Sequence, residues 1–274
     1  MLDYLLQFIK EDAPNGDITS AAVTPEIACD AIIRAEQEGI IAGLEEASAL
    51  FSHFGVSVTS IAVDGDTVCK NSSLLSLKGE AKKILLVERT ALNIIGRMSG
   101  IATQTRKMAD IVSASNPNCR VAATRKTCPG FRILDKKAVK IGGGDPHRMN
   151  LSDGILIKDN HLALVPLRSA ILAAKNNSVY KKIEVEVETS DDALIAATSG
   201  ADIIMLDNMS PVQISRTIRL LENEHLRDRV VIEISGSIDE SCISQYALLK
   251  VDVISLGVLT HSVRNFSVNL EIIP

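Results

Sequence analysis

Residues 154–161 of the chain read GILIKDNH, a short β-branched run that ends in the polar residues KDNH. Five further runs share this design: CRVAATRK (119–126), IEVEVE (183–188), ADIIMLDN (201–208), VVIEISGS (230–237) and VDVISLG (251–257). Short apolar runs between helical stretches are typical of strands in βα units. Parallel strands in such units bring their C-terminal ends to one edge, where barrel enzymes carry their active sites. The pattern therefore predicts an α/β barrel enzyme.

The six runs are fewer than the eight strands of the common closed barrel, so we expect a smaller or incomplete barrel. The preceding segment mixes strands and helices without βα regularity. It begins with a helical pattern at 2–10 and continues with the strand-like residues 28–43 and the helical residues 43–55. This mixture predicts a separate α+β domain of about 100 residues.

The bulk composition limits the possible classes of protein. The chain has 274 residues, of which 46% are hydrophobic and 23% charged, with a formal net charge of −5. An acidic chain of this kind is not expected to bind nucleic acid or a membrane surface in general. The N-terminus lacks the features of a signal peptide, and no run approaches ~20 apolar residues. We therefore expect a cytoplasmic protein. The five cysteines contain no CxxC pair, which argues against a disulfide framework or a zinc ribbon.

A long helical pattern runs from about residue 81 to 114 and leads into the barrel. Because glycine weakens a helix interior, Gly96 and Gly100 are predicted to divide it. Asp191 and Ser210 are candidates for helix N-caps, and Gly200 is a candidate for a helix end.

Basic residues gather at the predicted strand ends although the chain as a whole is acidic. Arg125 and Lys126 end one run, Lys158 ends another, and His147 and Arg148 follow the GGG of residues 142–144. Four permanent cations on one rim would repel one another by a few kcal/mol, so their convergence predicts an anionic ligand. The three glycines are expected to let the backbone approach that ligand.

Carboxylates and small residues end the remaining runs. Glu186 and Asp207, at neighbouring strand ends, suit ribose hydroxyls or a Mg²⁺-diphosphate. The last two strands end in Ser235, Gly236 and Ser237 and in Ser255, Leu256 and Gly257. Loops after the last two strands of barrel enzymes commonly bind phosphate. A phosphorylated sugar with a diphosphate, together with a carboxylated acceptor, fits this rim.

These segments resemble the quinolinate phosphoribosyltransferase family. The resemblance rests on TRKTCPGFR (124–132), GGGDPHR (142–148), LIKDNH (156–161), IEVEVE, IIMLDN and ISGS, and extends to EDAPNGDITS (11–20), EGIIAG (38–43) and ERTALNIIGRMSGIAT (88–103). It implies an N-terminal α/β open sandwich followed by an incomplete TIM-like α/β barrel. On this basis we expect the sandwich over residues 1–103, joined by the tail 262–274, and the barrel over 104–261.

The resemblance also implies an activity: quinolinate and phosphoribosyl pyrophosphate would give nicotinate mononucleotide, diphosphate and CO2 in NAD synthesis. Catalysis would depend on Lys126, Lys158, Glu186 and Asp207, of which the two acids would also hold Mg²⁺, directly or indirectly. The substrate-binding set would comprise Arg89 from the partner subunit, Arg125, Lys126, His147, Arg148, Lys158, Glu186, Asp207, and the loops Ser235–Ser237 and Ser255–Gly257. The implied assembly is a homodimer with a shared active site, and the sequence leaves a hexamer open.

The chain departs from the family pattern at Ser237, where glycine is usual, at Cys128, where threonine is usual, and at Ser267, where an aspartate is expected. Three other readings stay open on the sequence. A paralogue associated with molybdenum transport would use another acceptor, but it lacks the lysine of LIKDNH. A Schiff-base aldolase would use Lys126 or Lys158 as its nucleophile. A regulatory descendant would bind phosphoribosyl pyrophosphate without catalysis, but it would need a broken rim.

Overall fold

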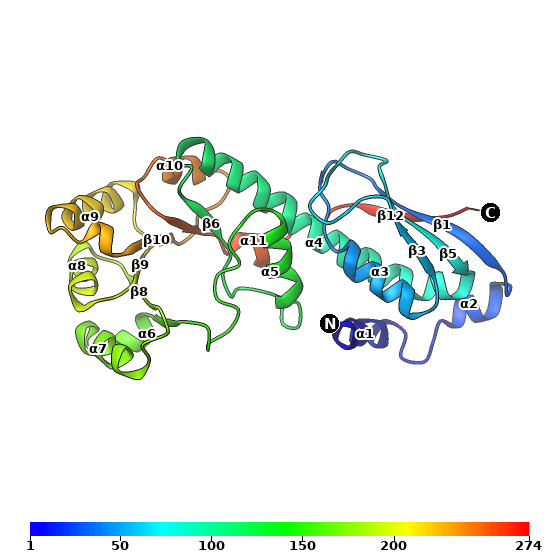
Figure 1. The fold of residues 1–274 in the computed structure, drawn as a ribbon, viewed down its shortest axis with the longest axis horizontal. Helices are drawn as coiled ribbons and strands as arrows, with labels where there is room; N and C mark the ends of the chain where they lie inside the picture. The colour runs from blue at the N-terminus through cyan, green and yellow to red at the C-terminus, as the bar shows by residue number, and fades with distance from the viewer. Residues whose placement is uncertain (274) are drawn as a thin grey trace. The chain divides into compact units, whose positions relative to one another are not determined.

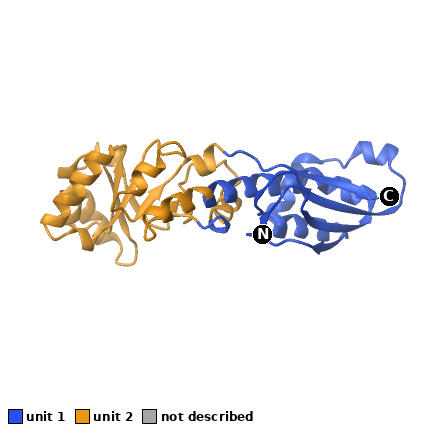
Figure 2. Ribbon diagram, turned by 90° about the horizontal axis from the view of Figure 1, so that it is seen from above, with its two compact units in different colours: residues 1–106, 140–143, 263–274 blue, residues 107–139, 144–262 orange. Residues whose placement is uncertain are grey.

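The structure, a computed structural model, describes residues 1–273 and contains two compact units (Figures 1 and 2). Unit 1 comprises residues 1–106, the short segment 140–143 and the C-terminal segment that begins at Val263. Unit 2 comprises residues 107–139 and 144–262. For comparison, the sequence-based boundary lies at 103/104 and the sequence-based tail begins at residue 262.

Unit 1 is built on a four-stranded antiparallel sheet in the order β12-β1-β5-β3. The strands are β1 (Ala28–Ala35), β3 (Ser57–Ser60), β5 (Ser73–Glu80) and β12 (Val268–Ile273), and β2 (Gly39–Ile40) pairs separately with β4 (Thr67–Val68). The helices before the long α4 are α1 (Leu2–Asp12), α2 (Ile18–Val23) and α3 (Leu44–His53). Ala31, Ile33 and Ala35 alternate along β1 and are buried, as expected for a sheet with one covered face.

The C-terminal segment joins unit 1 despite the departure at Ser267. The Ser267 hydroxyl donates to the Glu36 carboxylate at 2.5 Å, and its backbone N–H donates to the Gln37 side chain at 3.2 Å. These bonds lead the chain into β12, which pairs with β1 along its whole length. Serine therefore serves at this position.

The prediction that glycines divide the long helix is wrong, because α4 (Ala81–Ser115) is continuous. The glycines instead allow the C-terminal segment to lie close to the helix. A Cβ atom on Gly100 would lie 2.3 Å from the carbonyl oxygen of Arg264, and one on Gly96 would lie 2.9 Å from that of Phe266. The packing gained at these positions outweighs the weak helix propensity of glycine.

Replacing Gly100 with alanine tests this packing. In an ordinary helix interior the change stabilises by roughly 0.5–1 kcal/mol. Here the added methyl collides with backbone, so we expect the free energy of unfolding of unit 1 to fall by about 1–3 kcal/mol. Urea unfolding of Gly100→Ala, with Asn93→Ala at an exposed position of the same helix in unit 1 as control, measures the change. A more stable Gly100→Ala variant would contradict the close approach.

Unit 2 is an incomplete parallel barrel, as the sequence predicts. Its strands are β6 (Arg120–Ala122), β7 (Ile155–Ile157), β8 (Ile183–Val187), β9 (Ile203–Asp207), β10 (Val231–Ser235) and β11 (Val253–Ser255), and they pair in parallel in the order β6-β11-β10-β9-β8-β7. The two ends of this sheet, β6 and β7, leave the barrel open between them. Ala122 of β6 forms an isolated parallel bridge with Asp145, so the segment after the three glycines runs beside the free edge of β6.

Helices connect and cover the strands of unit 2 (Figure 1). They are α5 (Arg132–Ile141), α6 (Asp159–Leu162), α7 (Leu167–Asn177), α8 (Ser190–Ser199), α9 (Pro211–Asn223), α10 (Ile243–Ala247) and α11 (Val258–His261), with a 3-10 turn at Arg227–Arg229. Val185 and Val187 are buried in the core that the helices complete, so the alternating acids of β8 face the barrel interior. Within residues 1–273, no helix has both the length and the apolar composition needed to span a membrane.

The helix ends of unit 2 confirm two of the three predicted caps. The Ser210 side chain accepts from the backbone of Gln213 and forms a capping box, and Gly200 ends α8 with a φ of 90°. Asp191 is wrong as a cap because it lies inside α8. Thr189 is the N-cap there, with its side chain accepting from the backbone N–H of Asp192. Asp and Thr are both favourable N-cap residues, and the point at which β8 ends decides that α8 begins after Thr189.

In the run of three glycines at 142–144, Gly142 allows close packing against α4. A Cβ atom there would lie 2.5 Å from the carbonyl oxygen of Ala102 and 2.7 Å from the Cβ of Thr105, both on α4. Gly143 has a φ of 91°, a left-handed conformation that favours glycine. The expectation that this glycine run brings backbone to a ligand is therefore wrong at Gly142, whose backbone lies close to α4 instead.

Candidate active site

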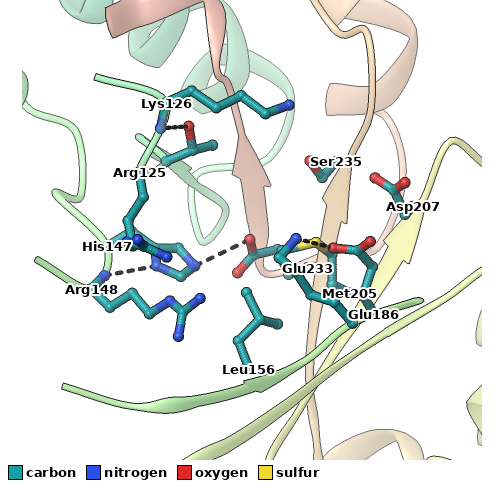
Figure 3. A pocket seen from close by; sticks show the side chains of 12 residues that line it. Arg125, Lys126, His147, Arg148, Leu156, Glu186, Met205, Asp207, Glu233 and Ser235 are labelled. Atoms are coloured by element: carbon teal, nitrogen blue, oxygen red, sulfur yellow. Dashed lines mark hydrogen bonds and ion pairs between the residues drawn. The ribbon is translucent and has the colours of Figure 1, made fainter. Parts of the chain in front are cut away.

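A cavity of about 360 Å³ opens in unit 2, and several of its lining residues end or follow the parallel strands (Figure 3). Its lining residues are Thr124, Arg125, Lys126, His147, Arg148, Leu156, Lys158, Glu186, Met205, Asp207, Glu233 and Ser235. The four predicted cations, the predicted histidine and the two predicted acids thus line one space, although they lie far apart in the sequence.

The arginines of the cavity carry unsatisfied binding capacity. The Nε atom of Arg125 is buried and has no hydrogen-bond partner among the described residues. Arg148 uses one nitrogen to bind the carbonyl oxygen of Gly154 at 3.1 Å. Burial, and then the positive charge of Arg125, lower the pKa of Arg148. An anion bound near both guanidinium groups would offset this repulsion on Arg148.

The opposite wall carries the two carboxylates at the ends of β8 and β9. Lys158 donates to Glu186 at 2.5 Å, and Figure 3 shows Glu186 and Asp207 side by side at the cavity wall. Burial, and then the negative charge of Glu186, raise the pKa of Asp207. Glu186 and Asp207 together thus carry more negative charge than Lys158 alone offsets. This wall of the cavity therefore suits a ligand group that brings positive charge or hydroxyl donors.

His147 occupies the floor of the cavity between two buried glutamates. Its Nε2 atom lies 3.4 Å from Glu233 and 3.6 Å from Glu184. Burial lowers the pKa of His147, but the hydrogen bonds and charges of Glu184 and Glu233 outweigh it and raise the pKa to about 9. The two carboxylates therefore favour the charged ring at neutral pH, but a charged ring carries a hydrogen on Nδ1 and must break the hydrogen bond that Nδ1 accepts from the backbone N–H of Arg148.

His147, Glu184 and Glu233 are close enough to hold a metal ion, because their ligand atoms lie within 4.8 Å of one another. The backbone N–H of Arg148 donates to Nδ1 of His147 at 2.7 Å. In the neutral ring Nδ1 is therefore the acceptor, and Nε2 carries the hydrogen that points to the glutamates. A metal would need the lone pair of that same Nε2, so the geometry favours hydrogen bonds to carboxylates.

A second cavity, of about 320 Å³, is lined by the loops after β10 and β11. Ser235, Gly236, Ser237, Ser255 and Gly257 line it together with Ile238, Asp239, Val258, Lys126 and His261. Lys126 and Ser235 also line the first cavity, so the two cavities adjoin at these residues.

The backbone of the loop after β10 is tightly constrained. Gly236 has a φ of 107°, and a Cβ atom there would lie 2.2 Å from the Asn208 side chain. Ser237 adopts a φ of 50°, which costs a non-glycine residue about 1–2 kcal/mol. The usual glycine at this position therefore has a conformational reason, and serine adopts the same backbone at some cost.

Several predicted residues lie elsewhere. Leu256 is fully buried and lines neither cavity. The hydroxyl of Ser255 donates to Glu233 at 2.5 Å, so its backbone rather than its side chain is available to a phosphate. Arg89 belongs to α4 in unit 1 and is exposed, whereas all lining residues of both cavities come from unit 2.

Sequence reasoning missed Glu233 and His261. The alternation of VVIEISGS places Glu233 on the same strand face as Ser235, so a period of two could have identified it. His261 lies in the last turn of α11, four residues after Gly257, and a Cβ atom on that glycine would lie 3.0 Å from the imidazole. No strand-end signal marks His261.

A parallel barrel with a cation-rich cavity beside serine- and glycine-lined loops is an enzyme fold for anionic, phosphate-bearing substrates. Comparison with known proteins gives the family. The model of the quinolinate phosphoribosyl transferase C-terminal domain matches residues 101–271, and that of the N-terminal domain matches residues 17–99. The chain therefore belongs to the quinolinate phosphoribosyl transferase family.

Relatives match over nearly their whole length. The chain is 44% identical to a probable carboxylating nicotinate-nucleotide pyrophosphorylase of Methanothermobacter thermautotrophicus, over 99% of both chains. It is 32% identical to the carboxylating nicotinate-nucleotide pyrophosphorylase of Rattus norvegicus, over 97% of this chain and 88% of the relative. The solved structure of the nicotinate-nucleotide pyrophosphorylase from Francisella tularensis is 34% identical with a TM-score of 0.91, over 99% of this chain and 97% of that one.

Proposed function

We propose that this chain is a quinolinate phosphoribosyltransferase that joins quinolinate to phosphoribosyl pyrophosphate and releases diphosphate and CO2. The product is nicotinate mononucleotide, a precursor of NAD. The observation that carries the proposal is that the cation-rich cavity and the cavity of the phosphate-type loops share the lining residues Lys126 and Ser235. Family membership and the names of the full-length relatives agree with it.

The arginine side of the cavity would bind quinolinate. Its two carboxylates match the guanidinium groups of Arg125 and Arg148, which hold carboxylates in bidentate geometry. The buried Nε of Arg125 would gain a partner, and His147 would supply a further donor or charge. The loops Ser235–Ser237 and Ser255–Gly257 would take the 5′-phosphate with backbone N–H groups, with His261 beside them.

The diphosphate would leave past Lys126 and Lys158, whose ammonium groups offset the charge that develops on it. Glu186 and Asp207 would steady the positive ribosyl centre and bind its hydroxyls. After the ring nitrogen attacks the ribosyl carbon, that nitrogen is cationic. Its positive charge stabilises the electron pair left on the adjacent ring carbon when the C–C bond to the departing CO2 breaks. This step needs no further protein base, and a proton from solvent replaces the lost carboxylate.

The residues fit Mg²⁺. Burial, and then the negative charge of Glu186, raise the pKa of Asp207, and a cation bound between the two acids would offset both effects. These two acids would hold the ion directly or through water. When bound with diphosphate, Mg²⁺ supplies charge neutralisation of the leaving group.

An aldolase is the alternative from another class. A Schiff-base lysine has to act as a neutral amine. The Nζ atom of Lys158 instead donates to the carboxylate of Glu186 at 2.5 Å, so it is engaged with an acid rather than free to attack a carbonyl carbon. The geometry thus supports a role for Lys158 as a fixed cation.

A cytoplasmic location remains a prediction from the sequence.

We further propose a homodimer in which Arg89 of each subunit completes the site of the other. Arg89 is exposed, and among residues 1–273 it has no hydrogen-bond or ion-pair partner that would hold it in place. An exposed arginine without a partner is free to meet an anion bound in another subunit. Assembly of dimers into a hexamer stays open.

The assigned roles predict different kinetic defects. Arg148→Ala removes a charged contact to quinolinate, so we expect its KM to rise roughly 10- to 150-fold. Lys158→Ala removes charge stabilisation of the leaving group, so we expect kcat to fall roughly 100- to 1000-fold. The assay follows quinolinate-dependent release of diphosphate and CO2 with Mg²⁺, and chelation of Mg²⁺ should abolish it. Arg168→Ala, an exposed arginine on α7, is the control. Wild-type kinetics in both site variants would remove these assignments.

Subunit mixing tests the shared site. Arg89→Ala and Lys158→Ala homodimers should each be nearly inactive. Random exchange of equal amounts makes about half of the dimers mixed, and each mixed dimer has one complete site of two. Activity should therefore recover to about a quarter of the wild-type level. The readout is specific activity after mixing, with mixed dimers quantified by a tag on one variant. Mixed dimers without activity would contradict supply of Arg89 across the interface.

The raised pKa of His147 predicts a pH dependence of quinolinate binding. The ring carries a positive charge below pH 9 and loses it above, so the KM for quinolinate should rise as the pH passes through about 9. In His147→Gln the KM should be higher at pH 7 and lack this rise, whereas the exposed His225→Gln should follow the wild type. Parallel pH profiles for the wild type and His147→Gln would show that the ring's charge does not contribute.

A further inference from the structure

Lys136 is a buried cation to which the proposed mechanism gives no part. It lies in the middle of α5 and is 1% exposed. Its Nζ atom donates to the carbonyl oxygen of Pro146 and, at 2.7 Å, to the carbonyl oxygen of Arg148. The lysine thus reaches from the helix to the backbone on either side of His147.

Keeping a charge at this depth is costly. Burial, and then the positive charge of Arg132, lower the pKa of Lys136 to about 8, against the opposing influence of Asp145 and Asp153. The two hydrogen-bond acceptors are neutral carbonyl groups, which compensate a buried charge less well than a carboxylate does. An apolar side chain of similar length would fill the space at lower cost, so the benefit of the ammonium group lies in what it holds.

The segment that Lys136 holds has a strained backbone. His147 adopts a φ of 55°, in the left-handed region that non-glycine residues rarely occupy. Such a conformation persists only where the surroundings impose it. The Asp145 side chain accepts from the backbone N–H of His147 itself at 2.7 Å. Arg132 donates to the carbonyl oxygen of Met149 at 3.2 Å, after it.

Lys136 adds contacts to the carbonyl groups of the two residues that directly flank His147. The ring of His147 and the guanidinium of Arg148 both line the first cavity, so the direction of both side chains depends on this backbone. Displacement of a binding group by about 1 Å can cost two orders of magnitude in rate.

We propose that Lys136 is a positioning residue that fixes the loop 145–149, so that His147 and Arg148 are directed at the acceptor acid before it binds. The lysine does not touch substrate. It satisfies the two carbonyl groups that would otherwise turn toward water as the loop relaxed. The inference rests on the proposed function for its kinetic readout, and amide exchange provides a readout that is independent of any substrate.

The test compares Lys136→Met, which keeps length and loses the donors, with Lys140→Met, the same change at an exposed position of α5. In Lys136→Met we expect the KM for quinolinate to rise at least about tenfold and the KM for phosphoribosyl pyrophosphate to stay within about twofold. Backbone amides of residues 147–149 should exchange faster with solvent, while those of β8 and β9 stay protected. Lys140→Met should behave as the wild type.

An unchanged KM for quinolinate, or an equal rise in both KM values, would overturn the inference, because the second result indicates a general structural role. Where Lys136→Met does not fold, Lys136→Ala is assayed with and without propylammonium ions, which can enter the vacated space. Recovery of the quinolinate KM by the cation supports positioning, and absence of recovery opposes it. A wild-type enzyme inactive with quinolinate would refute the proposed function, while amide exchange would still decide the role of Lys136.

Discussion

The repulsion among the cations of the first cavity is the constraint on which the rest of unit 2 depends. Two unit charges 4 Å apart interact with about 4 kcal/mol at an effective dielectric constant of 20, so a cluster of four needs compensation in the folded state. Glu186 supplies part of it through Lys158. Glu184 and Glu233 supply more from beneath, through His147. The compensation is incomplete on the arginine side, which leaves that side ready for an anionic guest.

This balance requires residues from distant parts of the chain to hold fixed directions, and the backbone provides them. Parallel pairing places Glu186 opposite Met205 on the neighbouring strand, and Asp207, two residues further along that strand, lines the same cavity. The loop that carries His147 has no strand of its own beyond the single bridge to Ala122. Its direction depends on side chains instead, with Lys136 central among them. Gly236 similarly allows the loop after β10 to lie against Asn208.

Much of this could be predicted because strand-end chemistry is local in sequence. The residue that ends each apolar run can be seen in the sequence, and parallel strands place their C-terminal ends at one edge of the sheet. Arg125, Lys158 and Glu186 could therefore be identified from the sequence. Predictions failed where a contact came from elsewhere in the chain. Gly96 and Gly100 read as helix breakers, yet the C-terminal segment packs over both of them. The hydroxyl of Ser255 reads as a phosphate donor, yet it bonds to the buried Glu233.

The sequence by itself determined the class of fold and the identity of the charged groups, because periodicity of two and 3.6 and the order of strands are written along the chain. Only the tertiary structure decided which charge meets which. The three acids of IEVEVE are alike in sequence, but Glu184 meets a histidine, Glu186 meets a lysine and Glu188 is exposed to solvent. The position of each acid along β8 decides how deeply it is buried. That depth exists only once the neighbouring strands have formed the barrel around β8.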